Sequence, residues 1–589
     1  MGKSKTIVAA AVGDCVHVAG VLGFLRLAEA QGFAVSFLGP GVPVNKLCDA
    51  AIEADADFIA ASYRLGPVAG RQIVLQLMNR AETDPALRWR RWVFGGTPPV
   101  AALALEAGLF EAVFSGEEDL DEVISYLKRA AASDAPLPAA SAAGARPAEP
   151  ELVGLSLLQR MAHKSPYPLL RHHFGRPSVA ETAEGIRQIA EAGVLDIVSI
   201  GPDQNAQESF FHPEDQDHAQ DGAGGVPLRE AGDLKALHSA AQAGNHPLLR
   251  CYSGTRDLLQ MARLLSETIH NAWAAIPLFW YDVLDGRSER PLIEAIAENQ
   301  AAVGWHAERG LPVEVNESHH WSLRDAPDVV AVAAAYLAAY NARALGVRDY
   351  IAQYMLNTPP RTTARMDLAK MLAKIDLIES LAGTDFRVYR QVRAGLASFP
   401  PDLSLAKGQL AQATALGMNL NPHIVHVVGY SEGQHAAGPA EVIESCKIAR
   451  GVIRSTLEGL PDSAADPVVQ ERRAELKQEA AVLIEAIRRL APAGVADPLT
   501  DPETLTRAVA LGYLDAPHLK GNPAAAGRVV TRVIGGACVA VDRDGRPMSE
   551  EERLSEIVKG GVADANMRPA SAVPELGMAD PLHRPEFPR

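Results

Sequence analysis

Short apolar runs alternate with longer amphipathic segments over the first 131 residues. The runs are "TIVAAAV", "FAVSFLG", "FIAASY", "RWVFGG" and "EAVFSG", and the segments between them, such as "GVLGFLRLAEAQG" and "GRQIVLQLMNRAE", carry apolar residues at helical spacing. Buried strands that alternate with helices predict a parallel, doubly wound sheet, because parallel strands need a crossover connection. Ligands of such sheets bind beyond the carboxyl ends of the strands. We therefore expect a domain over residues 1–131 with its site at that edge.

Residues 132–150 break this pattern. The stretch "ASDAPLPAASAAGARPAEP" contains Ala, Pro and Ser with almost no large apolar side chains, which is a composition typical of a linker. A second domain is therefore expected to begin near residue 151.

Eight further apolar runs follow between residues 151 and 460. They are "YPLLRHH", "LDIVSIG", "PLLRCYS", "AAIPLFWYD", "LPVEVNE", "DYIAQYM", "DFRVYRQ" and "IVHVVGY", each separated from the next by a helical segment. That number of runs predicts a (β/α)8 TIM barrel, whose chemistry lies at the carboxyl ends of the strands. Polar or aromatic residues gather there, namely His172, His173, Arg250, Tyr252, Tyr281, Asp282, Asn316, Glu317, Tyr354, Arg390 and Tyr430. Any single one of these residues could equally be a polar group at a strand end that forms hydrogen bonds with neighbouring loops. The whole set together indicates an enzyme site.

The remaining residues, 461–589, differ from the barrel pattern. A helical segment rich in Glu and Arg is followed by "RVVTRVIGGACVAVD", and together they predict a small α+β appendage. The last thirty residues carry several prolines, as in "RPASAVPELGMADPLHRPEFPR", and we expect them to be extended and poorly ordered.

Composition and charge narrow the function classes. The 589 residues include 56 Lys and Arg against 72 Asp and Glu, a formal net charge of −16, which argues against a nucleic-acid surface. The apolar runs are too short to span a bilayer, and the start "MGKSKTIVAAAVGD" fits a buried strand better than a signal peptide. We therefore expect a cytoplasmic protein. Its five cysteines share no CxxC spacing, so neither a disulfide framework nor a structural zinc site is indicated.

The loop after the first strand, "GDCVHVAG", holds a histidine where a nucleotide-binding fold would carry glycines. The candidate residues at the ends of the first, third and fourth runs are Asp14, His17, Gly20, Ser62, Gly95 and Gly96. Between Gly20 and Ser62 lie 41 residues. This arrangement resembles the cobalamin-binding domain, a Rossmann-like (flavodoxin-like) domain with the signature Asp-x-His-x-x-Gly, a long spacer, Ser-x-Leu and then Gly-Gly.

The resemblance implies a role for each of these residues. His17 would be the lower axial ligand of cobalt in place of the cofactor's own nucleotide base, and Ser62 would meet the displaced nucleotide tail. Gly95 and Gly96 would let that tail pass close to the backbone, because any Cβ there would obstruct a buried ligand.

Two positions depart from the family pattern. Cys15 and Val16 both lie between Asp14 and His17, where the family has one residue, and Arg64 stands at the position of the family's leucine. The family's carboxylate accepts the second N–H of the histidine and so fixes its tautomer. Two alternatives stay open: Asp14 reaches the imidazole differently, or His17 lacks this partner. We expect His17 to ligate cobalt.

The barrel segment resembles the large subunit of glutamate mutase (methylaspartate mutase), whose small subunit is similar to residues 1–131. The resemblance is carried by "AGVLDIVSIGPDQNAQ", "LLRCYSGTRDLL", "AERGLPVEVNE" and "IVHVVGYSEGQHAAGPAEVIESCKIARGVIRSTLEG", and the appendage is also similar to the end of that subunit. The resemblance extends over nearly the whole chain and is carried by the order of the helices and strands. It implies an adenosylcobalamin-dependent isomerase in which the cofactor supplies a radical and the barrel positions an acid substrate away from water.

The resemblance also implies contacts with the adenosyl group. Glu432 matches the glutamate that holds its ribose, while a lysine of the family falls at Val428 and the acidic general base falls near Ala272.

The positions implied to bind the substrate differ more from those of the glutamate mutase family. The arginines that grip the two carboxylates of glutamate fall at His173, Gln207 and Tyr252, although Arg250 lies on the same face of its strand as Tyr252. We therefore expect a less charged and larger acid than glutamate, in contact with these four residues and with Tyr281. The expected catalytic residues are Glu432, Arg250 and Tyr281.

Two other functions are alternatives to the mutase. A corrinoid methyltransferase would place a helical cap before the cobalamin domain, whereas the first strand here begins near residue 5. A cobalamin-binding sensor or carrier without catalysis is favoured by the missing arginines and by the altered loop. An aminomutase would need a lysine for pyridoxal phosphate, and Lys3, Lys5 and Lys46 lie in no setting that suits a Schiff base.

Histidines elsewhere raise the question of a metal. His319 and His320 are adjacent, and His423 and His426 lie three apart. Adjacent residues on a strand point to opposite faces, so at most one of such a pair enters a site. We expect no metal beyond the cobalt on His17, and partners limited to a small-molecule acid, without nucleic acid or membrane. The resemblance further implies a homodimer.

Overall fold

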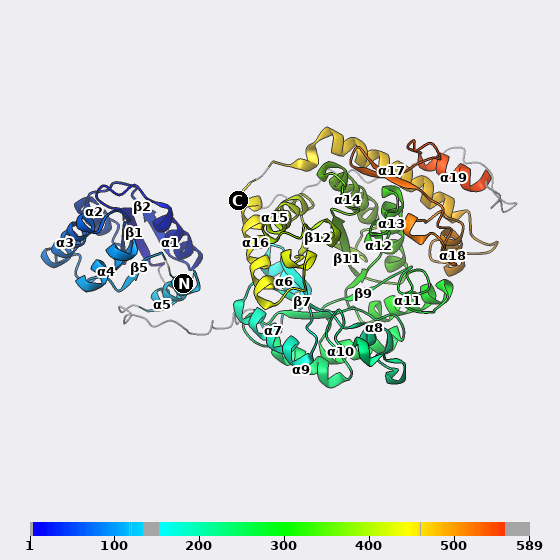
Figure 1. Ribbon diagram of the computed structural model, residues 1–589, viewed down its shortest axis with the longest axis horizontal. Coiled ribbons are helices and arrows are strands. Elements are labelled where there is room, and N and C mark those ends of the chain that lie inside the picture. Colours follow the sequence, from blue (N-terminus) through cyan, green and yellow to red (C-terminus); the bar gives the residue numbers. More distant parts are fainter. Residues whose placement is uncertain (1–3, 117, 119, 134–151, 460, 560–589) are drawn as a thin grey trace. The chain divides into compact units, whose positions relative to one another are not determined.

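The computed structural model describes residues 4–116, 118, 120–133, 152–459 and 461–559. The chain divides into two compact units, residues 1–146 and 147–589 (Figure 1). Among the described residues, no helix combines the length and the apolar character that crossing a bilayer requires.

The N-terminal unit is built on a five-stranded sheet with the order β2-β1-β3-β4-β5, and every pair of neighbouring strands is parallel. The strands are β1 (Thr6–Ala11), β2 (Ala34–Phe37), β3 (Phe58–Tyr63), β4 (Arg91–Gly96) and β5 (Ala112–Phe114). The helices are α1 (Ala19–Ala30), α2 (Val44–Glu53), α3 (Pro67–Thr83), α4 (Pro98–Ala107) and α5 (Leu120–Ala132). The five strands expected from the apolar runs are confirmed, and so is the doubly wound arrangement.

Helices cover both faces of this sheet. Alternate residues of β1 enter different cores: Ile7 packs with residues of α1 and α5, whereas Val8 packs with residues of α2, α3 and α4. Both faces of the strands are therefore buried, which explains why the runs are apolar throughout rather than alternating. The expected linker falls almost entirely outside the described residues, apart from its first two positions, 132 and 133.

The second unit contains an eight-stranded parallel sheet with the order β8-β7-β6-β13-β12-β11-β10-β9. Its end strands β8 and β9 lie beside each other, so the sheet forms a nearly closed barrel. The strands are β6 (Leu169–Phe174), β7 (Ile197–Ile200), β8 (Leu248–Cys251), β9 (Ala274–Ile276), β10 (Val313–Val315), β11 (Asp349–Leu356), β12 (Arg387–Ala394) and β13 (Ile424–His426). Each of the eight apolar runs overlaps one of them, which confirms the expected number of strands.

Helices connect and surround the barrel strands (Figure 1). They are α6 (Leu157–Lys164), α7 (Val179–Ala192), α8 (Gln204–Ser209), α9 (Ala231–Ala240), α10 (Leu258–Thr268), α11 (Leu292–Ala307), α12 (Ser318–Ser322), α13 (Asp328–Ala344), α14 (Ala364–Glu379), α15 (Leu403–Met418) and α16 (Pro439–Leu457). A short 3-10 turn, η5 (Tyr430–Gly433), follows β13. The carboxyl ends of the strands thus open toward α8, α12 and η5.

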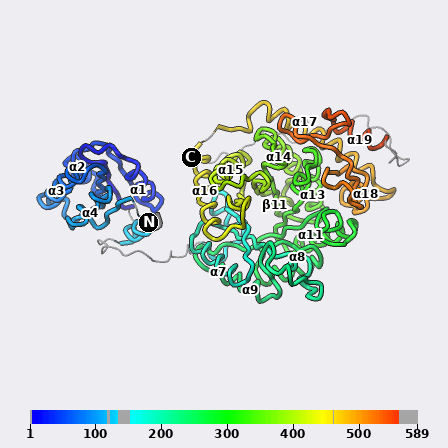
Figure 2. The backbone as a smooth tube through the Cα atoms, in the orientation of Figure 1, coloured from blue at the N-terminus to red at the C-terminus, as the bar shows by residue number. Residues whose placement is uncertain are grey.

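The C-terminal segment packs on this barrel within the same compact unit. It consists of α17 (Pro467–Arg488), α18 (Pro502–Ala510), the hairpin of β14 (Thr531–Ile534) and β15 (Ala537–Ala540), and α19 (Glu550–Lys559). Helix α17 lies along α13 and α14, and α18 contacts α11; the orange and red part of the tube follows this path (Figure 2). The helices and the hairpin agree with the α+β content expected here, while residues 560–589 lie outside the described part.

Candidate functional site

A cavity of about 440 Å³ opens in the N-terminal unit on the face of the sheet that α1 covers. Its lining comes from the first turns of α1, the ends of β3 and β4, and the segment that leads from β5 into α5. The lining residues include Gly20, Phe24, Leu27, Ser62, Val93, Gly95, Phe114 and Val123. Most of this surface is apolar, and the volume lies within the range of small-molecule sites.

Ser62 and Gly95 stand opposite each other on β3 and β4. A Cβ added to Gly95 would point into the cavity, where the nearest heavy atom is the Oγ of Ser62 at 3.9 Å. Gly96 behaves differently, since its Cβ would lie 3.1 Å from the ring of Phe94 and 3.2 Å from the carbonyl oxygen of Tyr63. Gly95 therefore keeps the cavity open, whereas Gly96 allows close packing on the other face.

The loop between β1 and α1 carries the candidate cobalt ligand. His17 is exposed, and its Nδ1 lies 4.0 Å from the Sγ of buried Cys15. Asp14 is turned away from the imidazole, because its carboxylate accepts a hydrogen bond from the hydroxyl of Tyr63 at 2.9 Å. Burial, together with this carboxylate, raises the pKa of Tyr63 to about 12, so the phenol stays a donor. Of the two alternatives for Asp14, the structure has the one in which this carboxylate does not reach His17, and no other described carboxylate bonds to the imidazole.

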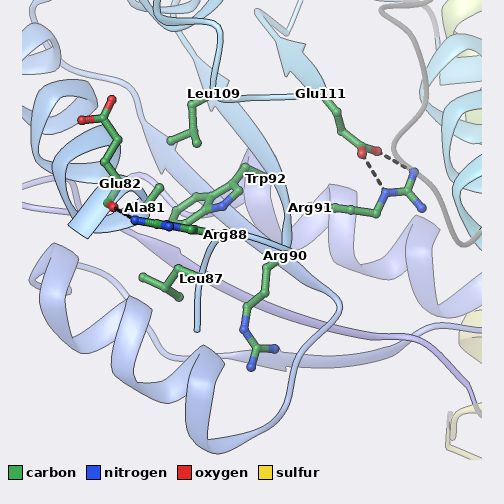
Figure 3. A pocket seen from close by; sticks show the side chains of 9 residues that line it. All are labelled: Ala81, Glu82, Leu87, Arg88, Arg90, Arg91, Trp92, Leu109 and Glu111. Carbon is green, nitrogen blue, oxygen red and sulfur yellow. Dashed lines mark hydrogen bonds and ion pairs between the residues drawn. The ribbon is translucent and has the colours of Figure 1, made fainter. Parts of the chain in front are cut away.

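A second hollow, of about 620 Å³, lies at the opposite end of the sheet and is bordered by three arginines (Figure 3). Each arginine already has a partner in the protein. Arg91 is held by both carboxylate oxygens of Glu111 at 2.7 Å, the Nε of Arg90 donates to the carbonyl of Ala86, and Arg88 donates to the carbonyl of Glu82. These pairings leave the hollow with little free binding capacity, so we place the candidate site at the first cavity.

The barrel interior carries charge. Four inward residues come from alternate strands, β6, β8, β10 and β12, and two positions further along the same strands come four more. The first set is Arg171, Arg250, Glu314 and Gln391; the second is His173, Tyr252, Asn316 and Arg393. Charged groups thus lie in both sets of inward residues. The second set, nearer the carboxyl ends of the strands, forms the barrel mouth.

Glu314 is the acid at the centre of this network. Its Oε2 accepts hydrogen bonds from the indole of Trp273 at 2.8 Å and from the amide of Gln391 at 3.2 Å, and it lies 3.4 Å from Nη2 of Arg250. Arg171 donates to the Oγ of Ser199 at 2.6 Å and to the Oε1 of Gln391 at 2.8 Å. The arginines are therefore anchored by neutral groups as well as by one carboxylate.

Positive charge predominates among the inward residues of the barrel. Burial lowers the pKa of Arg171 to about 9, with Arg250 as the next cause, so its guanidinium is still protonated at neutral pH. Burial, with the nearby arginines, also holds the pKa of His173 well below its ordinary value. The Nε2 of neutral His173 accepts from Arg171 at 3.0 Å and lies 2.8 Å from the hydroxyl of Tyr252. The barrel mouth can therefore attract an anion.

The expected substrate contacts are only partly brought together. Tyr281 joins the barrel mouth, since its hydroxyl accepts from Asn316 at 3.2 Å, although it follows β9 in a left-handed conformation with φ of 73°. Gln207 lies on α8 and donates to the carbonyl of Pro202 at 2.9 Å, so its side chain is committed outside the arginine network. The expectation of a neutral and aromatic lining is thus incomplete, because the barrel also carries Arg171 and Arg393, which the sequence analysis did not include. Their signal was the two-residue period that joins them to His173 and Gln391.

Glu432 lies in η5 at the barrel mouth. Its Oε1 is 3.4 Å from Nε2 of the fully buried His172 and accepts the backbone N–H of Gly429 at 3.3 Å. The carboxylate is therefore oriented by the protein while about a quarter of its side chain stays exposed.

The histidine pairs lie differently from the expectation. His319 and His320 belong to helix α12 rather than to a strand, and both are buried with ring centroids 4.4 Å apart. The argument from strand alternation was wrong for them, because the strand ends at Val315. Nδ1 of His319 accepts from Gln353 at 3.0 Å, while His426 packs its ring against His173.

No protein-family model matches this chain, and no curated protein matches it. Solved structures with some likeness include a novel cobalamin-binding protein from Desulfitobacterium hafniense DCB-2, at 21% identity over 22% of this chain and 58% of that chain, with a TM-score of 0.19. A type I 3-dehydroquinate dehydratase from Clostridium difficile shows 8% identity over 49% and 93% of the two chains, with a TM-score of 0.23.

A third structure, the cobalamin-dependent S-adenosylmethionine radical enzyme OxsB, shows 11% identity over 85% of this chain and 64% of that chain, with a TM-score of 0.17. This chain thus spans less than two thirds of the first and third proteins. At such TM-scores the likeness carries no argument about this chain, so its function has to be argued from the site itself.

Proposed function

We propose that the N-terminal unit binds cobalamin. The observation that carries the proposal is the apolar cavity whose wall is left open by the missing Cβ of Gly95 beside Ser62. A cavity of this volume and polarity suits the aromatic base of the cofactor's nucleotide tail. His17, on the loop after β1, would be the cobalt ligand; it is exposed, and Asp14 is bonded to Tyr63 instead of to its imidazole. When bound, cobalamin would supply the reactive cobalt–carbon bond.

We further propose that the barrel acts on a small organic acid. Arg171, Arg250 and Arg393 outnumber the single carboxylate of Glu314 among these inward residues, and guanidinium groups pair well with a carboxylate. Glu432 would hold the ribose of an adenosyl group, as the resemblance to glutamate mutase implies. The surrounding aromatic side chains would keep water from a reactive intermediate. The reaction we propose is a carbon-skeleton rearrangement that depends on adenosylcobalamin.

The test is the anaerobic absorption spectrum of the purified protein mixed with adenosylcobalamin or with methylcobalamin. We expect tight binding of the adenosyl form and a spectrum in which the cofactor's own base no longer ligates cobalt. His17→Ala should abolish that spectral change, while His218→Ala, at an exposed position of the other unit, should retain it.

Each other outcome changes the proposal in a defined way. A clear preference for methylcobalamin would replace the mutase by a corrinoid methyltransferase. Binding of adenosylcobalamin without turnover of any branched or linear acid would favour a sensor or carrier. Binding of neither form would contradict the proposal altogether.

A further inference from the structure

Arg64 lies at the mouth of the cavity in the N-terminal unit. It directly follows β3 and is one of the lining residues. A Cβ added to Gly20, in the first turn of α1, would lie 3.4 Å from Nη1 of Arg64, and a Cβ added to Gly116, after β5, would lie 3.1 Å from the same atom. The guanidinium therefore fits between two backbone segments that both carry glycine at the point of contact.

Among the side chains that the structure describes in this unit, those of residues 4–116, 118 and 122–133, none forms an ion pair with this guanidinium. The acid on the same rim is Glu118, and its oxygens are committed to the loop that carries it. They accept from the N–H and Oγ of Ser115 at 2.7 Å and from the N–H of Gly116 at 2.8 Å. Burial acts to raise the pKa of Glu118, but these hydrogen bonds together outweigh it, so the pKa lies below its ordinary value. This carboxylate is therefore ionised and already occupied. The backbone N–H of Arg64 donates to Cys15, which anchors the residue beside the loop of His17.

The surroundings of Arg64 favour the binding of an anion. The cavity behind it is mostly apolar. Helix α1 begins at Ala19, and its N-cap residue Val18 provides no side-chain cap, so the N–H groups of the first turn add positive potential at the same mouth. The protein as a whole carries a net charge of −16, which would otherwise repel an anion. An anionic group that enters this mouth finds a cation already in position.

We propose that Arg64 binds the phosphodiester of the cobalamin nucleotide tail. This inference rests on the proposed function and assigns one chemical group of the cofactor to one side chain. The tail carries a single anionic phosphodiester between its ribose and the corrin side chain, while its base is apolar. A bidentate guanidinium compensates the loss of water around a phosphate better than backbone groups alone. A leucine at this position, as in the family signature, could make no such contact.

The experiment compares two corrinoids by equilibrium dialysis, hydroxocobalamin and cobinamide, because cobinamide lacks the whole nucleotide tail and its phosphodiester. Wild type, Arg64→Leu, Arg64→Lys and Arg71→Leu are measured at low and at high salt. Arg71→Leu is the matched control: it removes the same charge from α3, on the opposite face of the sheet.

We expect Arg64→Leu to weaken hydroxocobalamin binding about 10- to 100-fold, the range for a charge-assisted hydrogen bond, and to leave cobinamide binding unchanged. Arg64→Lys should lose less, Arg71→Leu should lose nothing, and high salt should narrow the difference between wild type and Arg64→Leu.

Three results would overturn the inference, and they are distinguishable. If wild type binds hydroxocobalamin and Arg64→Leu binds it equally well, Arg64 makes no contact with the phosphodiester. If Arg64→Leu weakens both corrinoids alike, the arginine acts on the corrin or on the fold of the loop. If wild type binds neither corrinoid, the proposed function itself fails, and this inference fails with it.

Discussion

At the scale of single residues, two adjacent glycines illustrate two different physical demands. Gly95 faces a cavity and Gly96 faces packed side chains, although the sequence assigns both of them to the same role. Because successive residues of a strand point to opposite faces, a Gly-Gly pair at a strand end cannot serve one ligand with both members. Of the two glycines, only Gly95 borders the cavity where the nucleotide tail would lie.

Substitution separates the two roles. Gly95→Leu should fill the cavity and weaken cobalamin binding at least about tenfold, while unfolding stays close to that of wild type because a strand tolerates a branched side chain there. Gly96→Ala should cost about 1–3 kcal/mol of stability, since its Cβ would crowd Phe94 and Ala101. Cobalamin titration and urea unfolding measure the two effects. Equal loss of binding in both variants would contradict the assignment.

Asp282 is a second residue whose environment sets its chemistry. It is fully buried, its Oδ1 accepts the N–H of Leu284 at 2.7 Å, and its Oδ2 has no hydrogen-bond partner among the described residues. Burial is the main cause that raises the pKa of Asp282 to about 7 from the ordinary 3.8, and nearby Asp285 adds to it. The folded protein therefore prefers the neutral acid.

The sign of the pH dependence follows from this preference. Between pH 4 and 7 the folded state holds the proton more strongly than the unfolded state, so this group's contribution to the free energy of unfolding falls as pH rises, by at most about 4 kcal/mol. Asp282→Asn should be more stable than wild type at pH 8 and no more stable at pH 4. Urea unfolding at both pH values checks this, and a difference that does not depend on pH would refute it.

At the scale of elements, the barrel strands bring charge together through their two-residue period. Arg171 and Arg250 lie one step before His173 and Tyr252 on the inward faces of β6 and β8. The positions that match the arginines of the family hold other residues, namely His173, Gln207 and Tyr252. The strands instead carry arginine one inward position earlier and, on β12, at Arg393.

Glu314 of β10 is the carboxylate that compensates this arginine cluster, so its removal should be costly. Glu314→Ala should destabilise the protein by about 3–5 kcal/mol, because buried Arg250 would lose its counter-ion. Glu308→Ala, at an exposed glutamate of the same unit, is the matched control and should change stability by less than about 0.5 kcal/mol.

A double variant adds a stricter test of this pair. Replacing Arg250 by Met in the Glu314→Ala background should recover part of the stability that Glu314→Ala loses, because it removes the uncompensated charge as well. Urea unfolding monitored by tryptophan fluorescence measures all variants. A double variant as unstable as the sum of its parts would show that the two side chains do not act together.

At the scale of the whole molecule, the two units have separate hydrophobic cores. The cores of the N-terminal unit draw on residues between 7 and 130, and those of the barrel unit on residues between 157 and 554. The segment after residue 460 contributes to the barrel core through Leu476, Leu483 and Ile487 of α17. That segment is part of the barrel's stability rather than an independent addition.

Truncation tests this division. A fragment of residues 1–146 should fold and bind cobalamin as tightly as the full chain, because its cores are complete. A chain that ends at residue 460 should aggregate, because it exposes the faces of α13 and α14 that α17 covers. Circular dichroism, gel filtration and cobalamin titration are the measurements. An unfolded 1–146 fragment would contradict the first expectation, and a soluble, well-folded shortened chain the second.

The sequence alone determined the thirteen strands of the two parallel sheets and the loop of His17. A buried strand is recognised from consecutive residues, because it is a run of apolar side chains. A glycine or histidine at the end of such a run is recognised from the same short stretch. Tertiary structure alone decided which polar groups meet. Arg171 and Gln391, which share a hydrogen bond, are 220 positions apart in the chain. The hydroxyl of Tyr63 binds the carboxylate of Asp14, 49 positions away, so that Asp14 does not bind His17. The guanidinium of Arg64 lies beside Gly20 in the first turn of α1. Such contacts depend on strand order and register, which a linear pattern does not encode.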